Sequence, residues 1–296
     1  MHGISQRALA AWAGTARLPL LAQAGEQLAR LPVVAASARL ALFVAGARVP
    51  ATLVGEVPEE LVARDGGELR ARVAIVPTAR GVIVCDRLDA DPRDGDRVCW
   101  PDDSSYHLAR AIPPGRRASW LDLGCGSALA AIERPELADR VRATDLNARA
   151  VRYAALGARL SGIAIDARVA DLGAGGDGGD RYELVTCNAP IPNGDGPRWR
   201  ATDGAFVDRL FARTAALVAP AGLAVVHAAL DALLAATSAL PGDVRVVAYT
   251  PEDAPRGFGV AWWAPDAPSH RTFARRELTH DRPHIDWRDR DDAHAL

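Results

Sequence analysis

Short apolar segments that end in glycine or in a polar residue recur through the second half of the chain. The clearest covers residues 120–127, WLDLGCGS, in which two glycines follow an apolar run that contains Asp122. This pattern predicts a buried parallel strand that ends in a tight turn, followed by a helix from about Ala128. The glycines allow backbone amides to come close to a ligand, and the helix presents its amino end to the same place.

Three further segments that predict strands end at Asp145, Asp171 and Asn188. Helical periodicity lies between them, for example over residues 151–158, and this alternation predicts an α/β fold with a parallel sheet. The carboxyl ends of parallel strands meet at one edge of a sheet, so these side chains should border one ligand crevice. The alternative is an open α/β sheet in which the same acidic residues only cap helices.

The residues at this crevice favour S-adenosylmethionine over a dinucleotide. A dinucleotide-binding turn would have a third glycine at position 129, where this chain has Leu129. Asp122 suits a ligand with cationic groups, and S-adenosylmethionine carries an amino group and a sulfonium. We expect Asp145 to accept hydrogen bonds from ribose hydroxyls and Asp171 to accept one from the adenine amine.

The chain divides by pattern into residues 1–97 and residues 98–296, the second part being the ligand-binding domain. Helical periodicity covers residues 1 to about 35, and residues 69–76 and 81–87 predict paired strands. This order favours a winged-helix-like domain; a small domain that only caps one end of the sheet fits it equally. Residues 89–97 are typical of a linker, and the charged composition after Thr279 predicts a poorly ordered tail.

Composition narrows the chemistry further. The 296 residues carry a formal net charge of −2, which gives no general attraction to nucleic acid. No lysine is present, which excludes a lysine Schiff base and a phosphate-binding loop that needs lysine. His280 and His284 have metal-like spacing, but Pro283 prevents a shared helical face, so no metal site is predicted.

The cysteines and the hydropathy indicate a compartment. No apolar stretch has the length of a membrane span, and the start of the chain lacks the features of a signal peptide. We therefore expect a cytoplasmic protein without membrane contact. Scattered cysteines without metal-binding spacing are expected to stay reduced there, namely Cys85, Cys99, Cys125 and Cys187.

Residues 98 to about 265 resemble class I S-adenosylmethionine-dependent methyltransferases. Residues 122–126, DLGCG, are similar to the first motif of that family, with Ala128 where a third glycine is common. Residues 188–191, NAPI, are similar to the Asn-Pro-Pro-aromatic tetrapeptide of the branch that methylates amide or exocyclic amine nitrogens. Pro101, Ser105 and Leu108 match the entry motif of this branch. The N-terminal half, in which residues 82–87 lead into the linker, is similar to that of bacterial homologues that carry a winged-helix-like domain.

This resemblance implies a Rossmann-like, seven-stranded methyltransferase sheet with an antiparallel closing strand. It implies S-adenosyl-L-methionine as methyl donor and S-adenosyl-L-homocysteine as product. The implied cofactor-binding residues are Asp122, Gly124, Cys125, Gly126, Asp145, Leu146, Asp171, Leu172 and Asn188. The implied catalytic residues are Asn188, Ala189 and Pro190. The carbonyl groups of Asn188 and Ala189 would accept hydrogen bonds from an attacking N–H; the alternative for Asn188 is a helix or turn cap.

Two departures from the tetrapeptide bear on the methyl acceptor. Ala189 replaces the first proline, and Ile191 replaces the aromatic residue that would stack on a planar base. Loss of such a stacking face removes about 1–3 kcal/mol where bases stack on aromatic side chains. The expected substrate-contacting residues are Trp100, Ser105, Ile191 and Trp199, although Trp100 and Trp199 could equally be packing residues. Candidate proton acceptors are Asp195, Asp203 and His227, although such residues are more often caps or solvated charges.

The sequence therefore predicts a methyltransferase that methylates a nitrogen of a small molecule or peptide, with nucleic acid disfavoured. Methylation of ribosomal RNA, transfer RNA or a translation protein is the alternative that the family branch offers. A different class of function also fits the altered tetrapeptide: a catalytically silent, S-adenosylmethionine-binding partner protein. The sequence makes no prediction of the oligomeric state.

Overall fold

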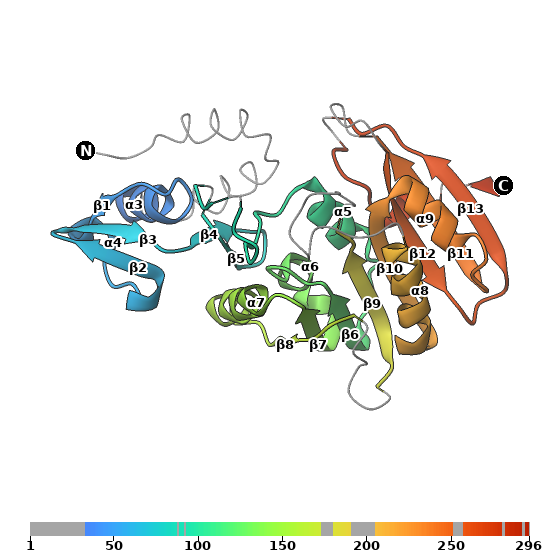
Figure 1. Cartoon of the computed structure of the whole chain (residues 1–296). Helices are drawn as coiled ribbons and strands as arrows, with labels where there is room; N and C mark the ends of the chain where they lie inside the picture. Colours follow the sequence, from blue (N-terminus) through green and yellow to red (C-terminus); the bar gives the residue numbers. More distant parts are fainter. Residues whose placement is uncertain are drawn as a thin grey trace.

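A mixed β-sheet flanked by helices forms the larger part of the protein (Figure 1). The computed structural model describes residues 33–87, 89–91, 93–172, 180–190, 205–250, 257–279, 282–291 and 294–295. Within these residues the sheet has nine strands in the order β14-β13-β11-β12-β10-β9-β6-β7-β8. The strands are β6 (Arg117–Leu123), β7 (Ala138–Asp145), β8 (Asp166–Val169), β9 (Tyr182–Asn188), β10 (Val218–Ala229), β11 (Asp243–Tyr249), β12 (Phe258–Ala264), β13 (His270–Arg275) and β14 (His294–Ala295).

The strand directions confirm the α/β class with an antiparallel closing strand. β8, β7, β6, β9 and β10 run parallel to their neighbours. β12 lies between β10 and β11 and runs antiparallel to both. β13 and β14 extend the sheet beyond the seven strands that the sequence predicts. The chain leaves β6 toward β7 on one side and later forms β9 on its other side, so the two halves diverge at the carboxyl end of β6, where such sheets bind ligands.

The period-two alternation of β6 explains how the sheet is covered on both faces. Trp120 belongs to the core cluster that α5 (Asp103–Ala111), α6 (Leu129–Glu133) and α7 (Ala148–Ser161) cover. Leu121 and Leu123 belong to a second cluster, formed with α8 (Phe206–Leu217) and α9 (Leu230–Thr237). In Figure 1, α8 and α9 lie on the opposite side of the strands from α6 and α7.

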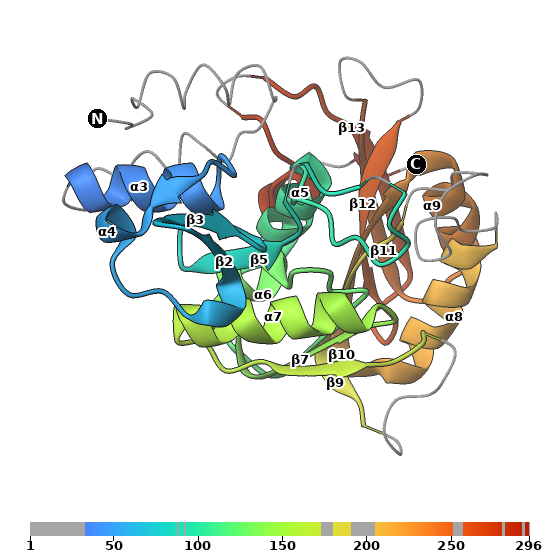
Figure 2. The same cartoon turned by 60° about the vertical axis from the view of Figure 1, so that its left-hand side comes forward.

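The N-terminal part contains two small sheets (Figure 2). Its elements are α3 (Val33–Phe43), β1 (Val49–Pro50), α4 (Ala51–Val54), the 3-10 turn Glu59–Leu61, β2 (Val62–Asp65), β3 (Glu68–Ala71), β4 (Ala74–Pro77) and β5 (Val82–Cys85). The predicted strand 69–76 is wrong as one element, because the chain turns at Arg72, whose amide and guanidinium donate to the carbonyls of Leu61 and Val62. β3 therefore pairs with β1 and β2, and β4 pairs with β5.

The β4–β5 hairpin joins the two parts of the molecule. Val84 belongs to the N-terminal cluster around Leu42 and Leu69, whereas Ile83 and Cys85 belong to the cluster around Trp120. The predicted boundary after residue 97 and the winged-helix-like character of residues 1–97 stay predictions. The helices predicted before residue 33 lie outside the described residues.

Residues 282–291 pack against the rest of the protein, although their charged composition predicts a poorly ordered tail. Ile285 is fully buried, and its amide donates to His107 Nδ1 at 2.9 Å. The 3-10 turn Trp287–Arg290 begins with a capping box at Asp286 and Asp289. Asp289 is buried and ion-paired with Arg276 and Arg282. The prediction of a poorly ordered tail after Thr279 is thus wrong for residues 282–291, because one apolar side chain and paired charges anchor them.

Candidate active site

The loop after β6 has the backbone conformation that its glycines predict. Gly124 and Gly126 have φ of 63° and 53°, a left-handed conformation that favours glycine. A Cβ atom at either position would meet nothing within 4 Å, so the space beside this loop is open. Ala128, which is fully buried, also has a left-handed φ of 57°, and it turns the chain into α6. The loop therefore presents its backbone to open space at the carboxyl end of β6.

Asp145, at the end of β7, holds this loop in place. Its carboxylate oxygens accept hydrogen bonds from the amides of Gly126 and Asn147, both at 2.8 Å. Burial raises the pKa of Asp145, and these amide hydrogen bonds oppose the increase. A carboxylate offers about four lone-pair sites, so acceptor capacity remains for ribose hydroxyls. The predicted neighbours Asp122, Gly124, Cys125, Gly126 and Asp145 thus lie at one edge of the sheet.

Asp122 is a buried acid in the middle of this edge. It is 3% exposed, and Thr186 Oγ1 donates to its Oδ1 at 2.6 Å. Trp120 Nε1 donates in turn to Thr186 Oγ1 at 2.8 Å. Burial raises the pKa of Asp122 to about 7, an effect that Thr186 reduces. A cation beside this carboxyl group would favour its ionised form, so the residue fits the positive groups of S-adenosylmethionine.

Exposed apolar side chains lie beside the acidic residues. Leu146 is 50% exposed directly after Asp145, and Val169 is 57% exposed at the end of β8. Apolar side chains at this edge suit a planar heterocycle such as adenine. Asp171 is exposed just beyond β8, whereas Leu172 packs against the cluster on the α8 side of the sheet.

Asn188, the last residue of β9, is held by hydrogen bonds to side chains of two other elements, α5 and β10. Its Nδ2 donates to Ser104 Oγ at 2.8 Å and to Ser105 Oγ at 3.3 Å, both in the first turn of α5. Its Oδ1 lies 2.9 Å from Nδ1 of His227, its neighbour in the pairing of β9 with β10. His227 Nε2 lies 2.7 Å from the hydroxyl of Tyr249 at the end of β11. The structure thus brings together Asn188 with the predicted Ser105 and His227.

The other predicted acceptor-side residues are only partly described. Ala189 is buried and donates its amide to the carbonyl of His227, and Pro190 follows it, half-buried. Ile191, Trp199, Asp195 and Asp203 lie outside the described residues. His280 also lies outside them, whereas His284 is buried beside His107. Within the described part of the chain, no three His, Cys, Asp or Glu residues form a group that could hold a metal.

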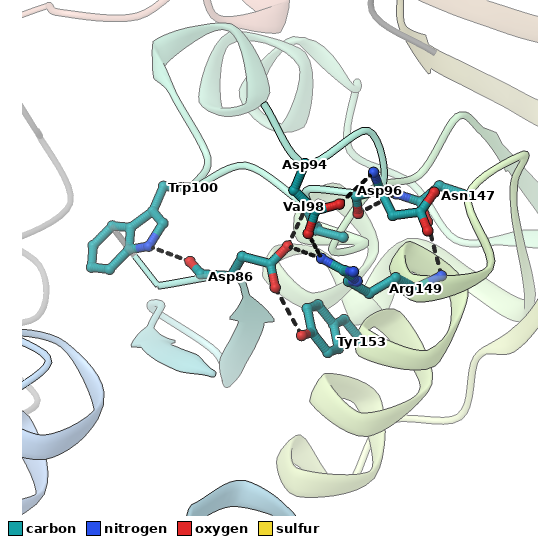
Figure 3. A network of polar contacts seen from close by, with 8 residues as sticks. All are labelled: Asp86, Asp94, Asp96, Val98, Trp100, Asn147, Arg149 and Tyr153. Carbon is teal, nitrogen blue, oxygen red and sulfur yellow. Dashed lines mark hydrogen bonds and ion pairs between the residues drawn. The ribbon is translucent and has the colours of Figure 1, made fainter. Parts of the chain in front are cut away.

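A buried polar network fixes the linker against α7 (Figure 3). Asp86, after β5, accepts hydrogen bonds from Tyr153 Oη at 2.9 Å and from the Val98 amide at 2.7 Å. Arg149 pairs with Asp86 at 3.2 Å and with Asp94 at 2.6 Å. Burial is the main reason that the pKa of Tyr153 is raised. The linker is therefore fastened to the first turns of the helix that follows Asp145.

The same network reaches two residues of the candidate site (Figure 3). Asn147, whose amide binds Asp145, donates its Nδ2 to the carbonyl of Asp96 at 2.8 Å. Trp100 donates its Nε1 to the carbonyl of Asp86 at 2.9 Å, and its ring packs against the core cluster. The indole of Trp100 is thus held by the end of the β4–β5 hairpin. Its predicted contact with the substrate stays a prediction.

Comparison with known proteins shows the family of this chain. The sequence profile of the methyltransferase small domain family matches residues 100–249, which is half of the chain. The chain belongs to the methyltransferase small domain family. It is therefore a methyltransferase with S-adenosylmethionine as methyl donor. The matched residues run from Trp100 to Tyr249, and this range includes the glycine loop, Asp145 and Asn188. No curated protein matches the chain.

Several solved structures resemble this methyltransferase at low identity. N-methyltransferase NodS from Bradyrhizobium japonicum WM9 is 17% identical, with a TM-score of 0.43 over 62% of this chain and 100% of that one. A predicted O-methyltransferase from Agrobacterium tumefaciens is 18% identical, with a TM-score of 0.44 over 60% and 88%. Ribosomal protein L11 methylase from Lactobacillus delbrueckii subsp. bulgaricus is 17% identical, with a TM-score of 0.39 over 54% and 77%. Likeness at this level carries no information on the methyl acceptor.

Proposed function

We propose that this methyltransferase methylates a nitrogen atom of a small-molecule or peptide acceptor. The observation that supports this is the hydrogen bonding of the Asn188 side chain. Among the described residues, its Oδ1 has one partner, His227, whereas its Nδ2 has two, Ser104 and Ser105. An amide oxygen has two lone pairs and an amide nitrogen two hydrogens, so the remaining capacity of this side chain is to accept. An N–H of the acceptor molecule would supply the missing donor.

The residues around this group have separate roles in the proposed reaction. S-adenosylmethionine, when bound, supplies a methyl group on a cationic sulfur. Asn188 and the carbonyl of Ala189 would accept N–H hydrogen bonds and so direct the nitrogen lone pair toward the donor, with Pro190 fixing the turn. The proposed cofactor contacts are Asp122, Gly124, Cys125, Gly126, Asp145, Leu146, Asp171, Leu172 and Asn188. Asn188 should contribute little to cofactor affinity, because it lies at the end of the fourth strand, beyond the adenosine-binding ends of the first three. Trp100, Ser105, Ile191 and Trp199 are the proposed substrate contacts.

The preference for a small molecule or peptide rests on two features of the sequence. The net charge of −2 gives no general attraction to nucleic acid, and Ile191 stands where an aromatic residue would stack on a base. We further propose a cytoplasmic location, since all four cysteines are free. Within the described residues, no helix combines the length and the apolarity that crossing a membrane requires.

A screen of acceptor pools tests the proposal. The purified enzyme and its Asn188→Ala variant are incubated with isotopically labelled S-adenosylmethionine and with separate pools of amines, amino-acid amides, peptides, transfer RNA and ribosomal subunits. Mass spectrometry then locates the label. We expect a labelled nitrogen in a small molecule or peptide with the wild type, and strongly reduced product with Asn188→Ala despite unchanged cofactor binding. Label only in RNA or in a translation protein would overturn the preference for a small acceptor. A cofactor-dependent increase in Tm with no product from any pool would indicate the silent partner protein instead.

A further inference from the structure

Five side chains form one continuous hydrogen-bonded chain through the acceptor side of the site. It runs from Asp102, which caps α5, through Ser104, Asn188 and His227 to Tyr249. The five side chains come from α5 and its cap, β9, β10 and β11, so four separate elements must meet for these hydrogen bonds to form. His227 is 2% exposed and Tyr249 is 4% exposed, so this end of the chain is shielded from water.

The donors and acceptors of this chain have one consistent direction. The Asp102 carboxylate can only accept, so Ser104 donates to it and accepts from Asn188 Nδ2. Asn188 Oδ1 then faces His227 Nδ1, which must donate. A neutral imidazole has one donor and one acceptor, so His227 Nε2 accepts from the Tyr249 hydroxyl. Burial keeps His227 neutral by lowering its pKa to about 4.

The opposite orientation of the Asn188 amide would break this pattern. Its oxygen would then face Ser104, whose hydrogen is already donated to Asp102. Ser104 would then either face an acceptor oxygen without a hydrogen to donate or give up its hydrogen bond to Asp102, so that orientation costs one hydrogen bond. The position of one carboxylate therefore decides which end of the amide faces the serines and which end faces His227.

We infer that Asp102, Ser104, His227 and Tyr249 are positioning residues, which hold the Asn188 amide with only an acceptor lone pair available to the methyl acceptor. This inference rests on the proposed role of Asn188 in binding an acceptor N–H. It selects acceptors that carry hydrogen on the reacting atom. It also assigns His227 a role other than the predicted one of proton acceptor, because both of its ring nitrogens are occupied and its Nδ1 already carries a proton.

The tautomer of His227 is the first test, and it needs neither cofactor nor acceptor. Long-range ¹H–¹⁵N NMR spectra of the labelled full-length protein distinguish the two neutral forms of a histidine from each other and from the cation. Loss of one signal set in His227→Gln assigns the resonances. We expect the neutral Nδ1–H form at neutral pH in the wild type. The Nε2–H form, or the cation, would overturn the inference.

Ligand binding gives the second test. Sinefungin resembles S-adenosylmethionine but carries an amine where the donor carries its methyl group, so it can donate to Asn188 Oδ1. S-adenosylhomocysteine lacks any group at that position. Titration calorimetry of both ligands should show that Tyr249→Phe leaves the Kd of S-adenosylhomocysteine within about twofold. The same change should weaken sinefungin by about tenfold, the size of one hydrogen bond to a charged group. Equal weakening of both ligands would indicate only a structural role for Tyr249 and would overturn the inference.

Tyr182→Phe is the matched control for Tyr249→Phe, because it removes a tyrosine hydroxyl that lies away from Asn188. Tyr182, at the opposite end of β9, accepts a hydrogen bond from Arg142, and Tyr182→Phe should leave both constants unchanged. Failure of wild-type protein to bind S-adenosylhomocysteine would contradict the proposed function. The NMR result would still decide the direction of the hydrogen bonds from Asp102 to Tyr249. The two proposals can thus fail separately.

Discussion

Asp145 and Gly126 are joined by a hydrogen bond of 2.8 Å between a carboxylate oxygen and a backbone amide. This contact connects the end of β7 to the glycine loop after β6, so one carboxylate both shapes the loop and borders the proposed ribose position. Removal of the Asp145 side chain should therefore weaken cofactor binding in two ways, through loss of the ribose contact and through release of the glycine loop.

Asp145→Ala should weaken S-adenosylmethionine binding by about 1.5–3 kcal/mol, the usual loss for a hydrogen bond to a charged group. Part of this loss comes from the freed Gly126 amide, because the loop is no longer held. Calorimetric titration of the variant measures the change. An unchanged Kd would remove Asp145 from the cofactor site.

Cofactor binding should release a proton from Asp122. Burial raises the pKa of this carboxyl to about 7, and a nearby cation would lower it again. Near pH 6, where Asp122 is mostly protonated before binding, we expect release of up to about one proton per bound S-adenosylmethionine. Calorimetry in two buffers of different ionisation enthalpy measures this number. Asp122→Asn should abolish the buffer dependence, and a wild type without such dependence would show that Asp122 does not sense the cation.

Arg149→Ala should lower the free energy of unfolding by about 1–3 kcal/mol, because it leaves the buried Asp86 carboxylate without its cationic partner. Urea unfolding measures this value. Arg159→Ala is a suitable control on the same helix: it removes the exposed ion pair with Glu60, which should contribute less than about 1 kcal/mol. Equal effects of the two variants would mean that the linker network adds no stability.

Acid should destabilise the fold through three buried histidines. Burial lowers the pKa of His107 to about 2 and those of His227 and His284 to about 4. Between the ordinary histidine value of about 6.5 and the lowered values, the unfolded chain binds protons that the folded chain does not. The stability that these neutral histidines contribute is therefore present above about pH 6.5 and is lost as the pH falls.

Asp122 acts in the opposite direction over this range. Its raised pKa of about 7 means that the folded chain holds its proton more tightly, so its contribution to stability is lost as the pH rises. Burial also raises the pKa of Asp145, and it raises that of Asp103 to about 6, so both carboxyls act in the same direction as Asp122. The slope is therefore the difference between three histidines and three carboxyls, and each uncompensated proton changes it by about 1.4 kcal/mol per pH unit. Urea unfolding at a series of pH values measures the slope, which His284→Phe should reduce. A slope that His284→Phe leaves unchanged would contradict this expectation.

The parts of the site that the sequence predicted are those with local signals. Gly124, Gly126 and the acidic strand ends each occur within a few residues of an apolar run, so their positions at the sheet edge followed from pattern alone. The partners of Asn188 do not have such a signal. Ser104 lies 84 residues away in the chain, and the role of Tyr249 depends on the ends of β10 and β11 facing each other across β12.

The predictions that were wrong also have physical explanations. Arg72 looks like part of a strand by alternation, yet its hydrogen bonds to the carbonyls of Leu61 and Val62 turn the chain. Ile285 is the one aliphatic residue in the mostly charged segment 282–291, so the composition gave no sign of its burial. Asp86 lies in the predicted strand 81–87, and Arg149 lies between the strand end at Asp145 and the helical segment 151–158. Only the tertiary fold makes them partners.

The contact between Ile285 and His107 also sets an order of assembly during synthesis. Every strand from β6 to β13 leaves the ribosome before Ile285, so the glycine loop, Asp122 and Asp145 are complete while α5 still lacks its last support. A nascent chain that ends short of residue 285 already contains the residues proposed to bind the methyl donor. Helix α5, whose serines bind Asn188, gains the hydrogen bond from Ile285 to His107 only when the final segment has been made, so the proposed donor residues precede this last contact of the proposed acceptor side.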